Sequence, residues 1–150
     1  MTQREFLSRV LGGNESAVAF CERAFRISQN IDDLYDGDKV VDDPKRDALI
    51  WDMLVGLPDN PFYQAHFDTL QPLIRAALSD WIDSTTLESG DDHEVSLAFV
   101  LRDQLTGVVS QCAYLVGGYQ HMRNVSVEIR RHFHNERLDD YQASLQERAP

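Results

Sequence analysis

The sequence contains little cysteine and no long apolar run. Its two cysteines, Cys21 and Cys112, form no CxxC motif and no Cys/His ligand spacing, so neither a zinc site nor a disulfide framework is indicated. Each lies among apolar residues at helical spacing, which predicts buried thiols in a reducing cytoplasm. With no secretory leader and no apolar stretch near the ~20 residues that span a bilayer, we expect no transmembrane helix.

Basic residues are also scarce. Fourteen lysines and arginines stand against 25 acidic residues, which gives a net charge of −11. This charge repels phosphate backbones and anionic membranes, so we expect neither nucleic acid nor a membrane as a direct partner. Acidic residues concentrate in 32–59 and 89–94, whereas the C-terminal quarter is more basic. That asymmetry either serves self-association or a protein partner, or is satisfied within one folded domain.

Strand signals and the common catalytic motifs are missing. The sequence shows no sustained period-two alternation, and it contains no Walker loop, GxSxG, HExxH or GxGxxG motif. Apolar residues instead recur at i, i+3, i+4 and i+7 through most of the chain. We therefore predict an all-α fold in which residues 1–150 form a single-domain helical bundle of five to seven helices.

Capping residues mark several predicted helix starts. Residues 2–11 are expected to form a short N-terminal helix that ends at Gly12-Gly13. Later helices are expected to begin at Asn14, at Asp43-Pro44 and at Asn60-Pro61. Because proline interrupts a helix, Pro72 is expected to divide the following segment into helices near 62–70 and 71–87.

The helix after Asp43-Pro44 is expected to run to about Gly56. Its apolar residues at helical spacing are predicted to face the core. These residues are Leu49, Ile50, Met53 and Leu54. The intervening acids, Asp47 and Asp52, are predicted to be exposed.

The longest apolar segment begins near His93 and predicts a long central helix, which we expect to bend or restart at Gly117-Gly118. Its remaining face carries a polar stripe. The stripe consists of Asp103, Gly107, Ser110, Tyr114 and His121. One interpretation makes Asp103, Tyr114 and His121 ligand-binding residues, and the other is an exposed or hydrogen-bonded polar face. The tail, residues 137–150, either packs as one more amphipathic helix or frays.

An unusual density of acidic residues marks residues 29–43. Six aspartates fall there, namely Asp32, Asp33, Asp36, Asp38, Asp42 and Asp43. Asp32 and Asp36 are four residues apart, so on a helix both project from one face and could reach a Mg²⁺ ion, with Asp33 or Asp38 assisting. Asp33 is predicted to point more outward than the other two. The alternative is a solvated helix end whose aspartates and glycine form a turn.

The segment Asp32-Asp33-Leu34-Tyr35-Asp36 resembles the Asp-Asp-x-x-Asp motif of polyprenyl diphosphate and terpene synthases. In those helical enzymes the motif holds Mg²⁺ against a substrate diphosphate. The resemblance therefore implies that Asp32, Asp33 and Asp36 are metal ligands. It covers five residues of 150, and the arginine pair that follows the motif in prenyl transferases is absent between Gly37 and Asp43.

Two functional classes follow from these patterns. The first is a small acidic helical interaction protein, of the kind found among accessory and phage-encoded proteins, which oligomerises and binds another protein. The second is a Mg²⁺-dependent enzyme or binding protein that acts on a phosphorylated or diphosphate-bearing small molecule through the Asp32–Asp36 cluster. The sequence does not decide whether the chain is an enzyme. The first class is favoured because we find no complete catalytic set.

Overall fold

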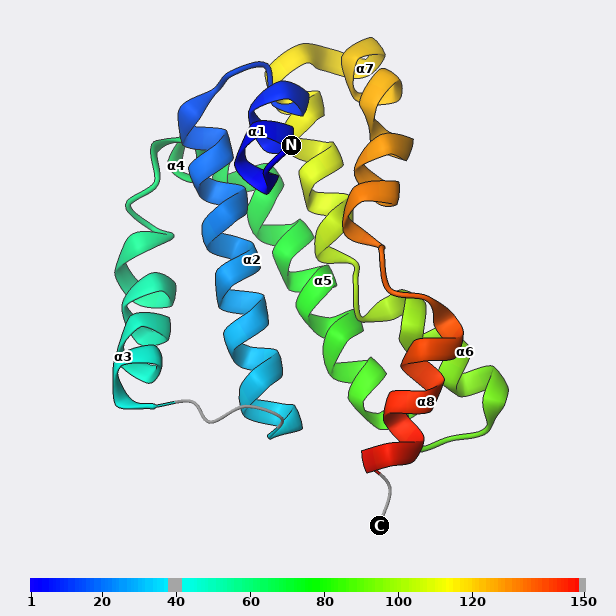
Figure 1. The fold of residues 1–150 in the computed structure, drawn as a ribbon. Coiled ribbons are helices and arrows are strands. Elements are labelled where there is room, and N and C mark those ends of the chain that lie inside the picture. The colour runs from blue at the N-terminus through cyan, green and yellow to red at the C-terminus, as the bar shows by residue number, and fades with distance from the viewer. Residues whose placement is uncertain (38–41, 149–150) are drawn as a thin grey trace. The chain divides into compact units, whose positions relative to one another are not determined.

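The computed structural model describes residues 1–37 and 42–148, and Asp38 of the acidic segment lies outside these residues (Figure 1). The regular secondary structure of the described residues is entirely helical, which confirms the predicted all-α class. Two compact units divide the chain, Met1–Phe67 (unit 1) and Asp68–Pro150 (unit 2). Within the described part of the chain, no helix combines the length and the apolar character needed to cross a membrane.

The described residues of unit 1 form four α-helices and a π-helical turn. They are α1 (Gln3–Val10), α2 (Glu15–Asp36), α3 (Asp43–Trp51), the π-helix η1 (Asp52–Gly56) and α4 (Pro61–Ala65). The caps agree closely with the sequence. Asn14 Oδ1 accepts a hydrogen bond from the Ala17 amide at 3.0 Å, and Asn60 Oδ1 accepts one from Tyr63 at 2.8 Å. The cap of α3 is Asp42, one residue before the predicted position.

The core of unit 1 forms where α1 and α4 pack against the first half of α2. The Phe20 ring of α2 lies 6.2 Å from that of Phe62 and 5.5 Å from that of Tyr63, centroid to centroid. Asn60 Nδ2 donates to the Ser16 carbonyl oxygen at 3.0 Å, which ties the start of α4 to α2. The Cys21 side chain is buried in this core, as predicted.

A buried ion pair fixes α3 and η1 to α2. Asp52, predicted to be exposed, is only 5% exposed. Its two carboxylate oxygens accept hydrogen bonds from Arg26 Nε at 2.8 Å and Nη2 at 3.1 Å, and Arg23 Nη1 lies 3.3 Å from Oδ1. Gly56 leaves room for the Arg23 side chain, because a Cβ at this position would lie 1.3 Å from Arg23 Nη1. The exposure prediction was wrong because it considered the helix period without these two cations.

Unit 2 is built from the helices of the C-terminal half. They are α5 (Phe67–Leu87), α6 (Asp92–Leu101), α7 (Leu105–Phe133) and α8 (Leu138–Arg148). The predicted break at Pro72 is wrong, because Pro72 lies inside α5 and the chain leaves the helical path at His66 instead. Pro72 is the sixth residue of α5, so its missing N–H costs the helix one backbone hydrogen bond, and the helix continues through it.

The predicted long central helix is divided. A turn at residues 102–104 separates α6 from α7, and long-range contacts hold that turn. The Arg102 guanidinium lies 4.9 Å from the centre of the Tyr141 ring, and Asp103 Oδ2 lies 3.4 Å from His134 Nδ1. The predicted bend or restart at Gly117-Gly118 is confirmed, since Gly118 has φ 83° and ψ −175° in the middle of α7.

The C-terminal segment packs against unit 2 through Tyr141. This side chain is fully buried, and its hydroxyl donates to Glu88 Oε1 at 2.6 Å. Its ring lies 5.3 Å from that of Phe99, centroid to centroid. Of the two alternatives for residues 137–150, the structure therefore shows the packed helix for 138–148.

Candidate functional site

The predicted metal residues lie on the last two turns of α2. Asp32 and Asp36 are both helical and partly exposed, so the four-residue spacing places them on one face as predicted. Asp33, predicted to point outward, is 8% exposed, and its Oδ1 accepts a hydrogen bond from Gln29 Nε2 at 3.1 Å. Among the described residues, no group of three or more histidine, cysteine, aspartate or glutamate side chains converges as metal ligands.

The predicted ligand-binding residues do not share one helical stripe. Asp103 lies in the turn before α7, Tyr114 is an exposed residue of its first half, and His121 follows the change of direction at Gly118. The predicted stripe is therefore wrong in its geometry. Gly107 and Ser110, which belonged to the same stripe, do line a cleft within unit 2.

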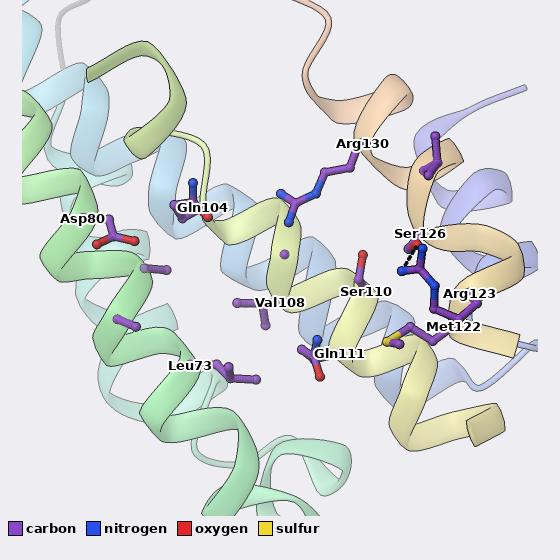
Figure 2. Close-up of a pocket in the computed structure, with 14 residues that line it drawn as sticks. Leu73, Asp80, Gln104, Val108, Ser110, Gln111, Met122, Arg123, Ser126 and Arg130 are labelled. Carbon is purple, nitrogen blue, oxygen red and sulfur yellow. Dashed lines mark hydrogen bonds between the residues drawn. The ribbon is translucent and has the colours of Figure 1, made fainter. Parts of the chain in front are cut away.

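That cleft lies between α5 and the two halves of α7, residues 105–117 and 119–133 (Figure 2). Its volume is about 470 Å³, within the range of small-molecule sites. The polar part of its lining consists of Asp80, Gln104, Ser110, Gln111, Arg123, Ser126 and Arg130. Two arginines against one aspartate leave it with a net positive charge, although the whole chain carries −11.

A series of polar contacts positions Arg130 at this cleft. Arg130 Nη1 lies 3.2 Å from His134 Nε2, and His134 Nδ1 lies 3.4 Å from Asp103 Oδ2. An arginine can only donate, so Nε2 accepts and the ring proton resides on Nδ1, facing Asp103. Asp103, predicted to bind a ligand, thus supports Arg130 through His134.

The face of α3 and η1 turned away from α2 exposes large apolar side chains. We call this face the α3–η1 apolar surface, and it consists of Ile50, Trp51, Met53 and Leu54. Trp51 is 62% exposed and Leu54 is 71% exposed. Only Leu49 of the four residues predicted to face the core is buried, so that prediction was wrong for the other three.

The buried ion pair explains this orientation. Leu49 and Asp52 are three residues apart and both are buried, so they define the inward face. Since Asp52 must face Arg23 and Arg26 on α2, the opposite side of the helix, with Trp51 and Leu54, faces solvent. An internal charge contact therefore holds an apolar surface outward.

Sequence reasoning did not identify Arg123 and Arg130 as site residues. A usable signal was present, because Arg123, Ser126 and Arg130 have the i, i+3, i+7 spacing of one helical face. The first half of α7 brings Ser110 to the same cleft because the chain changes direction at Gly118.

Compared with known proteins, the chain matches no family model, no curated protein and no solved structure.

Proposed function

We propose that the chain is a small acidic helical interaction protein that binds a protein partner through the α3–η1 apolar surface. The observation that carries the proposal is the outward position of Trp51 and Leu54 above the buried Asp52 contact. Burying a large apolar side chain is worth about 1.5–3 kcal/mol, so leaving both exposed forgoes a substantial stabilisation. Tryptophan is also enriched among the residues that dominate binding energies at interfaces.

Charge favours a different protein over a second copy as the occupant of this surface. Residues 1–67 contain 12 acidic and 7 basic residues, a net charge of −5, and Asp47 is exposed one turn before Trp51. Two identical surfaces would bring like charges together, which opposes association. A partner with an apolar centre and a basic rim is complementary. The buried cysteines Cys21 and Cys112 form no disulfide in the described part of the chain, which suits a reducing compartment, and we propose the cytoplasm.

Sedimentation velocity of the purified protein shows whether a different protein or a second copy of the chain occupies the α3–η1 apolar surface. We expect a monomer over a wide concentration range, because net charge opposes self-association. A dimer that dissociates when Trp51 and Leu54 are both replaced by serine would instead identify a second copy as the occupant and overturn the heterologous partner.

A Trp51→Ser/Leu54→Ser variant is expected to lose its partner and keep its fold. Both side chains are mostly exposed, so the free energy of unfolding should change by no more than about 0.5 kcal/mol. Partner binding should weaken by at least about 2 kcal/mol, or roughly thirtyfold, because the side chains at the centre of an interface carry most of its energy. The measurement is a titration of the purified partner against each variant.

The matched control is Leu97→Ser/Val100→Ser on α6. This pair has the same three-residue spacing and is also exposed, at 43% and 56%. We expect it to bind the partner like the unmodified protein. Equal loss in both double variants would mean that the effect is not specific to the α3–η1 apolar surface.

The second candidate function is binding of Mg²⁺ together with a phosphorylated ligand. It is supported by α2, which remains helical through Asp36 and presents Asp32 and Asp36 one turn apart. If these residues and Asp33 hold Mg²⁺ for a phosphorylated ligand, saturating Mg²⁺ at a hundred times its Kd should stabilise the fold by about 2.7 kcal/mol. Thermal melts with and without Mg²⁺ measure this. The shift should vanish in Asp32→Ala/Asp36→Ala and persist in Asp42→Ala/Asp43→Ala. An equal melting temperature with and without Mg²⁺ would remove this candidate.

A further inference from the structure

The Ser110 hydroxyl is a buried polar group for which the described residues supply no hydrogen-bond partner. The residue is 6% exposed and lines the cleft of unit 2. Burying a hydroxyl without a partner costs about 1–3 kcal/mol, so a serine here is unfavourable unless something else bonds to it. Alanine would fit the same space without that cost. The hydroxyl is therefore available to form a hydrogen bond with a ligand in the cleft.

Two guanidinium groups from the second half of α7 flank the same cleft. Arg123 Nη1 donates to Ser126 Oγ at 3.2 Å, and the Arg130–His134–Asp103 series orients Arg130. Figure 2 shows Arg130 reaching across toward the first half of α7 near Gln104. Guanidinium groups offer several N–H donors in a fixed plane, which matches the oxygens of a phosphate or a carboxylate.

Gly107 permits the close approach of Arg130 to the opposite wall. A Cβ at Gly107 would lie 3.1 Å from Arg130 Nη2, which is closer than ordinary van der Waals contact. With glycine, the guanidinium lies against the backbone of the first half of α7, one helical turn from Ser110. The backbone thus has space for the cation on the side of the cleft where the unpaired hydroxyl lies.

The other residues that line the cleft indicate which chemical groups the rest of the ligand would carry. Leu73, Val108 and Val127 contribute apolar walls, and Asp80 contributes a carboxylate from α5. An apolar body of modest size would contact these walls, and Asp80 would accept a hydrogen bond from a hydroxyl or amine on that body. The site suits a molecule with an anionic head and a small, partly apolar body.

We propose that this cleft binds a small molecule that carries an oxyanion, a phosphomonoester or a carboxylate, through Arg123, Arg130 and the Ser110 hydroxyl. The head group lies between the two halves of α7, and the body extends toward α5. This site shares no residue with the α3–η1 apolar surface and needs no metal ion.

The test titrates ¹⁵N-labelled protein with phenyl phosphate, benzoate and neutral benzyl alcohol and follows amide chemical shifts. These probes share a ring and differ in the head group. We expect one or both anions to shift the amides of residues 107–111 and 123–130, with benzyl alcohol at least about tenfold weaker. The relative affinities of phenyl phosphate and benzoate then identify the preferred oxyanion. Equal binding of benzyl alcohol, or shifts confined to other residues, would overturn the proposal.

Variants assign the contact. Arg130→Gln is expected to weaken anion binding about tenfold or more, because it removes a charge-assisted hydrogen bond. Arg131→Gln, its exposed neighbour outside the cleft, should bind like the unmodified protein. Ser110→Ala should weaken binding several-fold while melting at the same or a higher temperature without ligand. If Arg130→Gln and Arg131→Gln bound equally well, the arginine would not be part of a site.

Anion binding and partner binding can be tested independently. The Trp51→Ser/Leu54→Ser variant should bind the anion normally, and Arg130→Gln should bind the protein partner normally. Each variant should therefore lose one activity and keep the other. A variant that kept both activities would contradict only the proposal that its substituted residues test.

Discussion

Replacing Tyr141 by alanine is expected to lower the free energy of unfolding by about 3–4 kcal/mol. The side chain is fully buried, its ring packs on Phe99 and under the Arg102 guanidinium, and its hydroxyl bonds to Glu88. Truncation removes all of these contacts and leaves a cavity between α6 and α8. Urea unfolding followed by circular dichroism measures the change. A loss of less than about 1 kcal/mol would show that α8 does not stabilise unit 2.

The Tyr141→Phe variant distinguishes the contribution of the ring to stability from that of the hydroxyl. Tyr141→Phe should cost only about 1 kcal/mol, the net value of one hydrogen bond, with part of the cost arising from the unpaired Glu88 carboxylate. Burial, together with Glu88, raises the pKa of Tyr141. A raised phenol pKa means that this contribution to stability is complete below about pH 10 and is lost as the pH rises further. The phenylalanine variant should show a smaller alkaline loss.

Replacing Asp52 by alanine should cost about 2 kcal/mol. The carboxylate is buried and binds two arginines, and its loss leaves both cations without their partner. We expect less than the 3–5 kcal/mol of a fully buried pair, because Arg26 is about half exposed and can be hydrated again. Asp47→Ala on the same helix, which removes an exposed carboxylate, should change stability by less than about 0.5 kcal/mol.

The effect of Asp52 should depend on pH in a defined direction. Its hydrogen bond with Arg26 lowers the pKa of the carboxyl below its ordinary value. A lowered pKa means that the ion pair stabilises the fold fully above about pH 4, and the contribution falls as the pH drops through the folded-state pKa. The stability difference between the unmodified protein and Asp52→Asn should therefore shrink under acid conditions. A difference that stayed constant from neutral pH to pH 2 would contradict the ion-pair account.

The helical class and several helix starts could be predicted because they depend on neighbouring residues. Asn14 and Asn60 cap helices by bonding to amides three residues later, and such short-range chemistry is visible in the sequence. The restart at Gly118 has the same local origin, since glycine readily adopts positive φ.

The features that could not be predicted depend on contacts between residues that are far apart in the sequence. Asp52 has the spacing of an exposed residue, yet Arg23 and Arg26, more than twenty positions earlier, draw it inward and turn Trp51 outward. The turn at Asp103 likewise depends on His134, about thirty residues later. The sequence does not show whether a charged residue on a helix pairs with a buried partner or faces solvent. The outward apolar surface could therefore not be predicted.

The candidate sites divide in the same way. The spacing of Asp32 and Asp36 was visible because it belongs to one helix, and their role in holding a metal stays a prediction. The cleft requires Gly107, Ser110 and Arg130 to meet after the chain reverses at Gly118. Ser110 could be placed on a polar stripe from the sequence, but its lack of a hydrogen-bond partner emerges only from the packed helices.

Photo-crosslinking in cells that produce the protein tests the interaction surface most directly. A photoreactive phenylalanine analogue replaces Trp51 in one variant and Tyr119, which is similarly exposed at 65%, in another. We predict one discrete crosslinked protein from position 51, which disappears when Leu54 is also changed to glutamate, and no such product from position 119. The same product from both positions, or an adduct at position 51 that survives the Leu54→Glu change, would contradict the proposed interface.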